Sequence, residues 1–390
     1  MNQSDLPANQ DLDLWTNAVA QDAFVRHWTY FANRYKNVPY DKLSFNLVNE
    51  PADVDETTYI SVMRKAIDKI RGTSPNRVIF VDGLNYAREI IPSLRDEKNV
   101  IQAIHVYDPF TLTHYKAEWV TGSDTWPEPS WPMTSIPQYL YGLWKDELHS
   151  PLVLEGNFKK DDTITVNVNQ VSVQSTLQIR LDDALIYSKP FLCGPDLGDD
   201  WTEIVETQWG YQNISNKDYS THLPSDGSRL TLVNTEGDWM TLNKITISSS
   251  SGKMVIIPAN TTWGAKQGTY IITSEGKITD SEGRPATMLS ELSGRLETAR
   301  LEGIPVMIQE FGVYNKTPYP VTISYLSDVV SLFRESRVGF AMWNLIGTMG
   351  IINSDRAGCP YETFRGKQLD REMTNIMLGQ NKTTEGFVIK

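Results

Sequence analysis

The sequence predicts an α/β domain with a parallel sheet, interrupted by an antiparallel β-sandwich. Helical and strand patterns alternate over residues 1–150 and return over residues 281–390. Between them, residues 151–280 read as short alternating strands separated by Gly, Asn, Ser and Asp turns. A β-α-β-α-β order is typical of parallel strands with crossover helices, whereas closely spaced short strands are typical of a sandwich.

Each element of the α/β segments follows from local periodicity. Before the sandwich we predict a helix over residues 17–35, a strand Leu43–Val48, a helix Thr57–Arg71, a strand Val78–Val81, a short helix Tyr86–Arg95 and a strand Val100–Val106. After it we predict helix Met288–Leu301, strand Val306–Gln309, helix Ser324–Ser336, strand Gly339–Trp343 and a last helix near Leu369–Leu378. These elements amount to about five βα units.

Composition narrows the class of partner. The 390 residues suit two or three domains, and the formal net charge of −12 argues against nucleic acid and anionic membranes as partners. Eleven Trp and seventeen Tyr suit a neutral ligand such as a sugar. Cys193 and Cys359 lie far apart without metal-ligand spacing, so we expect no metal site and no cofactor. Residues 1–14 do not resemble a signal peptide, and a secreted or cell-surface protein would need a signal upstream of this chain.

Polar and aromatic residues follow the predicted parallel strands at their carboxyl ends. Asn49 and Glu50 follow one strand, His105 and Tyr107 close a second, Glu310 closes a third and Trp343 a fourth. In a (β/α)₈ TIM barrel, strand ends meet at one rim, so these residues would share a pocket. Two carboxyl groups in such a pocket can cleave a glycosidic bond, one as acid and the other as nucleophile.

The ordered motifs NEP, HVY, EFG and a strand-terminal Trp resemble glycoside hydrolase family 5, the cellulase family. The resemblance covers roughly residues 15–150 and 285–380. It implies a (β/α)₈ barrel with Glu50 as general acid/base and Glu310 as nucleophile of a retaining mechanism. It further implies that Asn49, His105, Tyr107 and Trp343 support the substrate or the nucleophile.

Two further regions offer aromatic side chains to a substrate. Trp119, Trp126 and Trp131 lie in a Pro-rich loop after the third predicted strand, and we expect Trp126 and Trp131 to contribute substrate contacts. The predicted sandwich resembles carbohydrate-binding modules of the galactose-binding, jelly-roll type, with Gly-Asp-Trp at 237–239. Its tryptophans, Trp201, Trp209, Trp239 and Trp263, could form a stacking platform or a core. The histidines outside the motifs, His114 among them, are expected to be structural.

The sequence departs from the family pattern at its amino-terminal end. The family's first three βα units are missing before Leu43, together with an Arg and a His that the family carries there. We therefore expect a partial barrel that needs the missing segment. The leading hypothesis is a retaining endo-β-1,4-glucanase, with mannan or another β-glucoside as a rival substrate. A non-catalytic carbohydrate-binding protein with a truncated barrel is the alternative, and the upstream sequence would discriminate between them.

Overall fold

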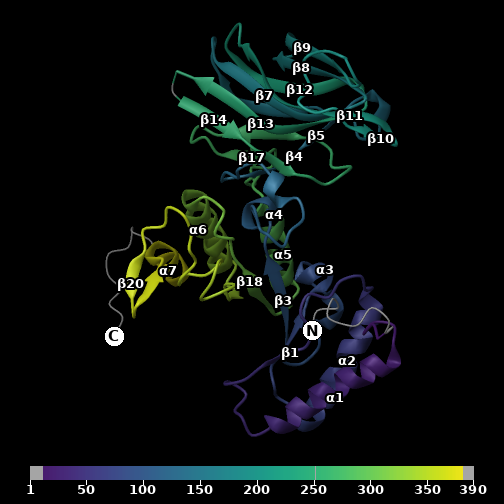
Figure 1. Ribbon diagram of the computed structural model, residues 1–390, viewed down its shortest axis with the longest axis vertical. Helices are drawn as coiled ribbons and strands as arrows, with labels where there is room; N and C mark the ends of the chain where they lie inside the picture. The colour runs from purple at the N-terminus through teal and green to yellow at the C-terminus, as the bar shows by residue number, and fades with distance from the viewer. Residues whose placement is uncertain (1–11, 251, 381–390) are drawn as a thin grey trace. The chain divides into compact units, whose positions relative to one another are not determined.

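The structure, a computed structural model, describes residues 12–250 and 252–380. The chain divides into two compact units (Figure 1). We call Met1–Pro129 with Leu292–Lys390 the α/β unit, and Ser130–Glu291 the two-sheet unit.

The α/β unit is built on a sheet of five parallel strands in the order β1-β2-β3-β18-β19. The strands are β1 (Phe45–Asn46), β2 (Ile79–Asp82), β3 (Val100–Val106), β18 (Val306–Phe311) and β19 (Gly339–Phe340). The five strands predicted from the apolar runs are thereby confirmed. The central strand β3 is buried almost throughout its length, as expected for a parallel strand covered on both faces. Both edge strands are only two residues long.

Helices precede, connect and follow these strands. They are α1 (Ala18–Arg34), α2 (Glu56–Thr73), α3 (Leu84–Ala87), α4 (Phe110–Thr113), α5 (Ser290–Leu301), α6 (Tyr319–Glu335) and α7 (Arg371–Leu378), with a hairpin of β20 (Glu362–Phe364) and β21 (Lys367–Leu369) before α7. The predicted helix Tyr86–Arg95 is wrong, because α3 ends at Ala87 and a 3₁₀ turn follows at Pro92–Leu94. Asn85, Tyr86 and Ala87 have positive φ angles, which a regular helix cannot accommodate.

Capping and burial explain why α1 and α2 form. The Asn17 side chain accepts hydrogen bonds from the first free N–H groups of α1, and the Asp55 side chain does the same for α2. The buried face of α2 repeats at helical spacing through Tyr59, Met63 and Ile70. This face packs against β1 and β2 in one apolar cluster.

A buried arginine fixes the chain between α1 and β1. Arg77 is fully buried, and its guanidinium donates to the carbonyl oxygens of Tyr35, Val38, Pro39 and Leu43 at 2.8–3.2 Å. Those carbonyls belong to a loop without regular structure, so the guanidinium satisfies acceptors that a strand or helix would otherwise satisfy.

The two-sheet unit contains two six-stranded sheets. One has the order β10-β11-β7-β13-β14 with β5 paired to β13, and the other has the order β17-β16-β6-β12-β8-β9. The strands of the first are β5 (Tyr139–Tyr141), β7 (Thr163–Ser172), β10 (Glu206–Thr207), β11 (Gly210–His222), β13 (Trp239–Ser249) and β14 (Gly252–Ile256). Those of the second are β6 (Leu152–Phe158), β8 (Gln174–Leu181), β9 (Ala184–Leu192), β12 (Gly227–Gly237), β16 (Thr269–Ile272) and β17 (Ile278–Asp280). Apolar residues of both sheets form one core, including Val166, Ile179, Leu232 and Ile245.

The units divide at different residues from those predicted. The sequence placed boundaries near 150 and 280, whereas the two-sheet unit begins at Ser130 and ends at Glu291. Pairing explains the earlier start, because β4 (Thr134–Pro137) pairs with β15 (Pro258–Asn260) and β5 pairs with β13. The later end follows from hydrogen bonds that join Ala286 to Ile278 and Met288 to Met133.

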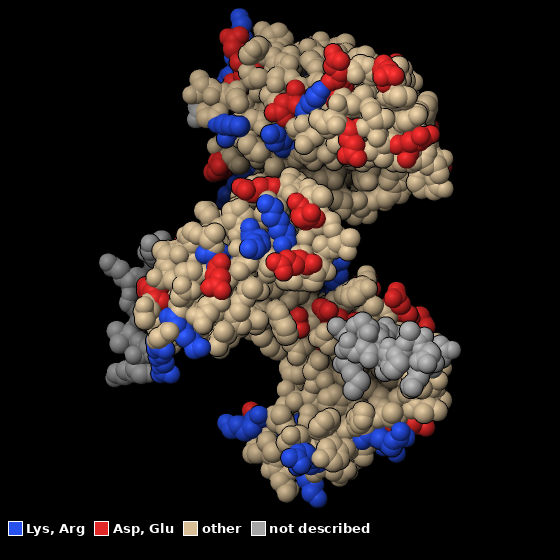
Figure 2. Space-filling view, in the orientation of Figure 1, with Lys and Arg blue, Asp and Glu red and all other residues tan. Residues whose placement is uncertain are grey.

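On the face drawn in Figure 2, Lys and Arg are interspersed with Asp and Glu over both units. Among the described residues, no helix has the length and apolar character required to span a membrane.

Candidate active site

Four polar side chains lie at the carboxyl ends of adjacent strands. Glu50 follows β1, Asp82 ends β2, His105 lies near the end of β3, and Glu310 lies near the end of β18. His105 and Glu310 are direct neighbours in the sheet register. The register shifts between Ile308 and Glu310, and such an irregularity redirects the side chain that follows it.

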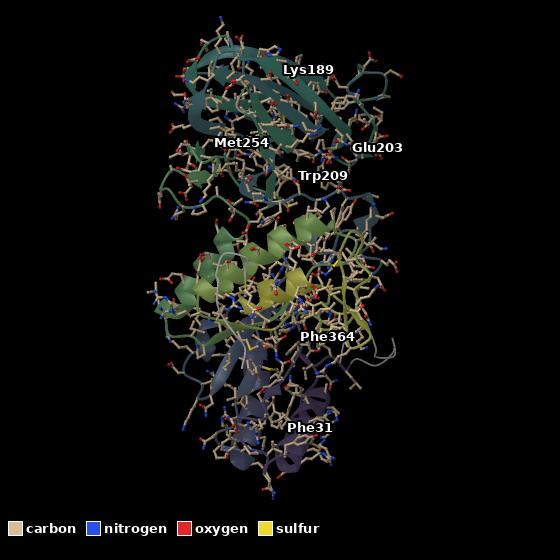
Figure 3. All side chains as sticks on the ribbon, turned by 90° about the vertical axis from the view of Figure 1, so that its left-hand side faces the viewer. Phe31, Lys189, Glu203, Trp209, Met254 and Phe364 are labelled. Carbon is tan, nitrogen blue, oxygen red and sulfur yellow. The ribbon has the colours of Figure 1, made fainter. Side chains whose placement is uncertain are left out.

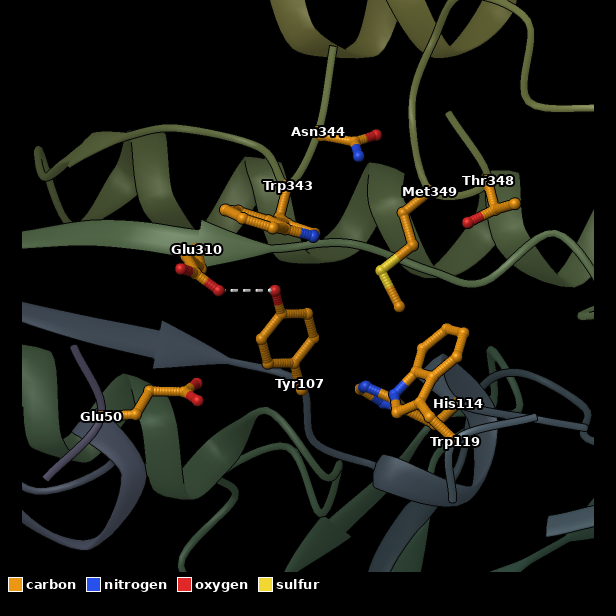
Figure 4. A pocket seen from close by; sticks show the side chains of 9 residues that line it. All are labelled: Glu50, Tyr107, His114, Trp119, Glu310, Trp343, Asn344, Thr348 and Met349. Carbon is orange, nitrogen blue, oxygen red and sulfur yellow. Dashed lines mark hydrogen bonds between the residues drawn. The ribbon is translucent and has the colours of Figure 1, made fainter. Parts of the chain in front are cut away.

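His105 joins the two glutamates. Its Nδ1 lies 2.7 Å from Glu50 Oε1 and 3.6 Å from Glu310 Oε2. The Tyr107 hydroxyl donates to Glu310 Oε2 at 3.0 Å (Figure 4). The His105 side chain is only 2% exposed, while those of Glu310 and Glu50 are 16% and 33% exposed. One carboxylate is therefore more enclosed than the other.

Asp82 is a buried carboxylate behind this group. Its side chain is fully buried and accepts hydrogen bonds from the Glu50 backbone N–H at 2.9 Å and from Asn46 Nδ2 at 2.6 Å. Its Oδ2 also lies 3.6 Å from His105 Nε2. Asp82 thus contacts the backbone of one glutamate and faces the imidazole that bridges both.

The electrostatic environment follows from three carboxylates around one imidazole. Burial opposes the charge on His105, but the hydrogen bond with Glu50 and the charges of Glu310 and Asp82 outweigh burial and raise the pKa of His105. Burial raises the pKa of Glu310, while His105 and the Tyr107 hydroxyl act in the opposite direction. Burial likewise raises the pKa of Asp82 against the hydrogen bonds from Glu50 and Asn46.

A cavity of about 240 Å³ opens onto this group. Figure 4 shows its lining, which comprises Glu50, Tyr107, His114, Trp119, Glu310, Trp343, Asn344, Thr348 and Met349. Trp343 is 51% exposed and Trp119 59% exposed, so both offer ring surface to a ligand. Aromatic surface beside carboxylates suits a ligand with both C–H faces and hydroxyl groups.

The structure brings together most of the residues predicted from the strand-end motifs. Glu50, Tyr107, Glu310 and Trp343 line the cavity, and His105 contacts both glutamates. Asn49 is exposed beside Glu50 and is not among the lining residues. Its predicted contact with a substrate stays a prediction.

Neither of the two loop tryptophans expected to contact a substrate is among the residues that line the cavity. Trp126 follows a 3₁₀ turn at Ser123–Thr125 and packs edge-on against Phe110 at 6.1 Å between ring centroids. Trp131 belongs to the two-sheet unit. Their roles in substrate binding stay predictions.

Several residues of the site were not predicted. Asp82 ends a strand in the same way as Glu310, so the strand-end rule that found the glutamates could also have found it. His114, expected to be structural, lines the cavity and stacks on Phe110 at 4.0 Å between ring centroids. Thr348 and Met349 lie in an irregular loop, and no sequence periodicity marks such a position.

The arrangement supplies two carboxylates close enough to act on one bond. One oxygen of Glu50, one of Glu310 and a ring nitrogen of His105 all lie within 4.8 Å of one another. Carboxyl groups about 5–5.5 Å apart suit double displacement at an anomeric carbon, whereas about 6.5–9.5 Å suits direct attack by water. The same three side chains are also the described His and carboxylate groups close enough to share a metal ion.

Comparison with known proteins points to one family. Residues 8–141 match the family described as Cellulase (glycosyl hydrolase family 5). Endoglucanase C of Acetivibrio thermocellus is 31% identical over 109 residues, covering 27% of this chain and 32% of that protein. Endoglucanase 3 of Fibrobacter succinogenes is 29% identical over 99 residues, covering 24% of this chain and 15% of that protein. The chain's match therefore spans about a third or less of these relatives' length.

A solved structure is similar over nearly the whole chain. The crystal structure of a glycoside hydrolase superposes with a TM-score of 0.54 at 22% identity, covering 97% of this chain and 72% of that one. At this identity the likeness concerns the fold. Together with the family match, it indicates an α/β fold of the (β/α)₈ TIM-barrel type.

Proposed function

We propose that this chain belongs to glycoside hydrolase family 5 and that Glu310 and Glu50 carry out retaining hydrolysis of a β-1,4-linked polysaccharide or oligosaccharide. The observation that carries the proposal is the approach of the two carboxylates to within 4.8 Å, with His105 between them. Because the matched relatives are named endoglucanases, a glucan is favoured over mannan, and the activity proposed is that of an endo-β-1,4-glucanase. A polymeric substrate in turn favours a secreted or cell-surface location.

Each group has a role that suits its contacts. Glu310 attacks the anomeric carbon, and the Tyr107 hydroxyl and His105 favour its ionised form against the effect of burial. Glu50 gives a proton to the leaving oxygen, and the same carboxylate then activates the water that releases the sugar. Glu50 is the more exposed of the two, which lets it exchange protons with water between these steps. Trp343 would lie under the sugar ring at the point of cleavage.

We further propose that additional βα units complete the sheet at its outer edges. The described strands number five, and closing a barrel of this type takes eight. Among the described residues, the edge strands β1 and β19 are two residues long and each pairs with another strand on one side only. Apolar side chains remain exposed on the chain segments before β1 and after β19, including Tyr30 at 58% and Leu345 at 60%. Phe31 on α1, labelled in Figure 3, is 39% exposed. The units could come from the same polypeptide or from another chain.

A mechanism-based label tests the chemistry without requiring fast turnover. In 2,4-dinitrophenyl 2-deoxy-2-fluoro-β-cellobioside, a Glu310 oxygen would bond to the anomeric carbon as the bond to dinitrophenolate breaks. We expect peptide mapping to place the sugar on Glu310. Because this leaving group needs no proton, Glu50→Gln should still be labelled, whereas Glu310→Gln should not. Glu118→Gln, which changes an exposed carboxylate of the loop carrying Trp119, should be labelled like the parent chain.

Release of reducing sugar tests the substrate class. Carboxymethyl-cellulose and mannan should be compared with the chain alone and with the polypeptide extended by three upstream βα units. We expect more hydrolysis of cellulose than of mannan, and more with the extended polypeptide. Label on a residue other than Glu310, or no label with either polypeptide, would refute the enzymatic proposal and favour the non-catalytic alternative.

A carbohydrate-binding role for the two-sheet unit is a second proposal, supported by one observation. Trp263 is 54% exposed, yet its ring is held by ring contacts at 5.2–6.1 Å with Tyr139, Tyr141 and Trp239. The Gly264 N–H also donates to the Tyr141 hydroxyl at 2.7 Å, which anchors the loop. A fixed and exposed indole suits stacking on a sugar ring.

Affinity electrophoresis in gels containing soluble polysaccharide measures this binding. Trp263→Ala should lose the retardation that the parent chain shows. The control is Trp209→Ala, because Trp209 is 71% exposed on the turn between β10 and β11 (Figure 3), where its ring contacts no other aromatic ring among the described residues. Equal retardation of the parent chain and Trp263→Ala would refute the proposal.

A further inference from the structure

The group formed by Glu50, His105 and Glu310 has the composition of a metal site. These side chains come from three separate segments, and one ligand atom of each lies within 4.8 Å of the others. The imidazole Nδ1 is 2.7 Å from one carboxylate and 3.6 Å from the other. Zinc bonds of about 2.0–2.2 Å place neighbouring ligand atoms roughly 3–3.5 Å apart. The first nitrogen–oxygen distance is slightly shorter than this range and the second slightly longer, so small shifts of these side chains and an approach of the two carboxylates would bring the ligand atoms into range.

The charge of the site favours a cation. Glu50, Glu310 and Asp82 contribute three carboxyl groups, and within the described residues the ion-pair partner of all three is the single His105. A divalent ion between the glutamates would offset the repulsion of these charges more fully than one imidazolium can. The ion could enter from solvent, because both glutamates line the cavity of about 240 Å³.

A metal site differs from a cluster of acidic groups in having a carboxylate behind the histidine ligand, and Asp82 provides this carboxylate. A metal-bound histidine usually donates its other ring N–H to a carboxylate, which fixes the ring and increases its basicity. His105 Nε2 is buried and has no hydrogen-bond partner among the described residues, yet it faces Asp82 Oδ2 at 3.6 Å. With Nδ1 directed at the two glutamates, the ring stands between a ligand position and a buried carboxylate that can accept from Nε2.

We propose that Glu50, His105 and Glu310 bind one Zn²⁺ ion, with Asp82 orienting His105. An imidazole with two carboxylates suits Zn²⁺ better than Mg²⁺ or Ca²⁺, which prefer sites made of oxygen alone. The cavity leaves a fourth position for water. Zinc at this position would occupy both carboxylates, so it would block the hydrolysis proposed above. That inhibitory consequence rests on the proposed function, whereas binding itself does not.

Binding is measured on the chain without substrate. Calorimetric titration with Zn²⁺ should give one site per chain, and Co²⁺ at the same site should produce visible absorption. We expect Glu310→Gln and Glu50→Gln to bind Zn²⁺ more than tenfold more weakly, and Asp82→Asn to lose about 10–100-fold through His105. Glu118→Gln, which removes one carboxylate charge without removing a ligand, should bind like the parent chain. Circular dichroism of each variant verifies that it has folded.

The outcomes separate this proposal from the enzymatic one. Equal Zn²⁺ affinity in Glu310→Gln and Glu118→Gln, or displacement of Zn²⁺ by a modest excess of Mg²⁺, would overturn the metal site. Labelling by the fluorosugar is measured with a chelator present and tests the catalytic roles alone. Where labelling occurs, Zn²⁺ should slow it and EDTA should restore its rate. A chain that binds Zn²⁺ but never becomes labelled would refute the enzymatic proposal and leave the metal site in place.

Discussion

His114 couples the stability of the α/β unit to pH. Burial lowers the pKa of His114 to about 4; the charge of Glu50 opposes this shift and that of Arg88 adds to it. In the unfolded chain a histidine has a pKa of about 6.5. Because the folded pKa is the lower one, the unfolded state takes up the proton first as pH falls, and stability is lost below about pH 6.5. Proton linkage lowers the free energy of unfolding by about 2 kcal/mol at pH 5 and about 3 kcal/mol at pH 4, compared with a chain that has a non-titrating residue at this position.

His114→Gln removes this titration and isolates its contribution. Hydrogen exchange of the β3 amides, followed by mass spectrometry, reports the opening free energy of the α/β unit without contribution from the two-sheet unit. From pH 7 to pH 5, we expect the opening free energy of the parent chain to fall by about 2 kcal/mol relative to that of His114→Gln. His27→Gln, at an exposed site on α1, controls for loss of a histidine. A difference that does not vary with pH would show that His114 is not held neutral by burial.

Two further predictions concern buried charges. Asp82→Asn should lower the pKa of His105, because the Asp82 carboxylate stabilises the imidazolium. An NMR titration of the His105 ring, in buffer that contains a chelator, measures this pKa. An unchanged pKa would contradict the role given to Asp82. Arg77→Met should reduce the unfolding free energy by at least about 3 kcal/mol, because four buried hydrogen bonds are lost; the carbonyls of Val38 and Leu43 lose the donor that Arg77 supplies, while those of Tyr35 and Pro39 keep a backbone N–H. Arg26→Met, at an exposed position on α1, should change it little, and equal losses in both variants would contradict this account.

The parallel sheet could be predicted because its signal is local. The strands Val100–Val106 and Val306–Phe311 are mostly apolar, as expected for parallel strands that are covered on both faces. The glutamates were found because each follows or ends such a run. The unit boundaries were not found, because β4 and β5 are only four and three residues long. Their membership of the two-sheet unit depends on pairing with strands that lie about a hundred residues or more further along the chain.

The remaining wall of the cavity could not be read from periodicity. His114 and Trp119 belong to the chain after β3, where α4 is a single turn. The position of His114 there is set by the stacking of its ring on Phe110. Nothing in the local pattern distinguishes His114 from a histidine on an exposed helix such as His27. Asp82 differs from His114 and Trp119, because both its strand and its place at the end of that strand could be predicted from the sequence. Its role became apparent only when neighbouring strands placed it against His105 and the Glu50 backbone.

The geometry of the group formed by Glu50, Asp82, His105 and Glu310 depends on neighbouring strands more than on a closed barrel. Asp82, His105 and Glu310 lie on β2, β3 and β18, which are consecutive in the sheet, and Glu50 is tied to β2 through its backbone N–H. Hydrogen bonds across these strands fix the distances among the four groups, whatever lies beyond β1 or β19. Substrate binding is different, because a polysaccharide needs walls on both sides of the cleavage point. The titration of His105 and the proposed binding of Zn²⁺ should therefore depend on the five described strands, while the rate of the proposed hydrolysis should depend on the proposed additional βα units.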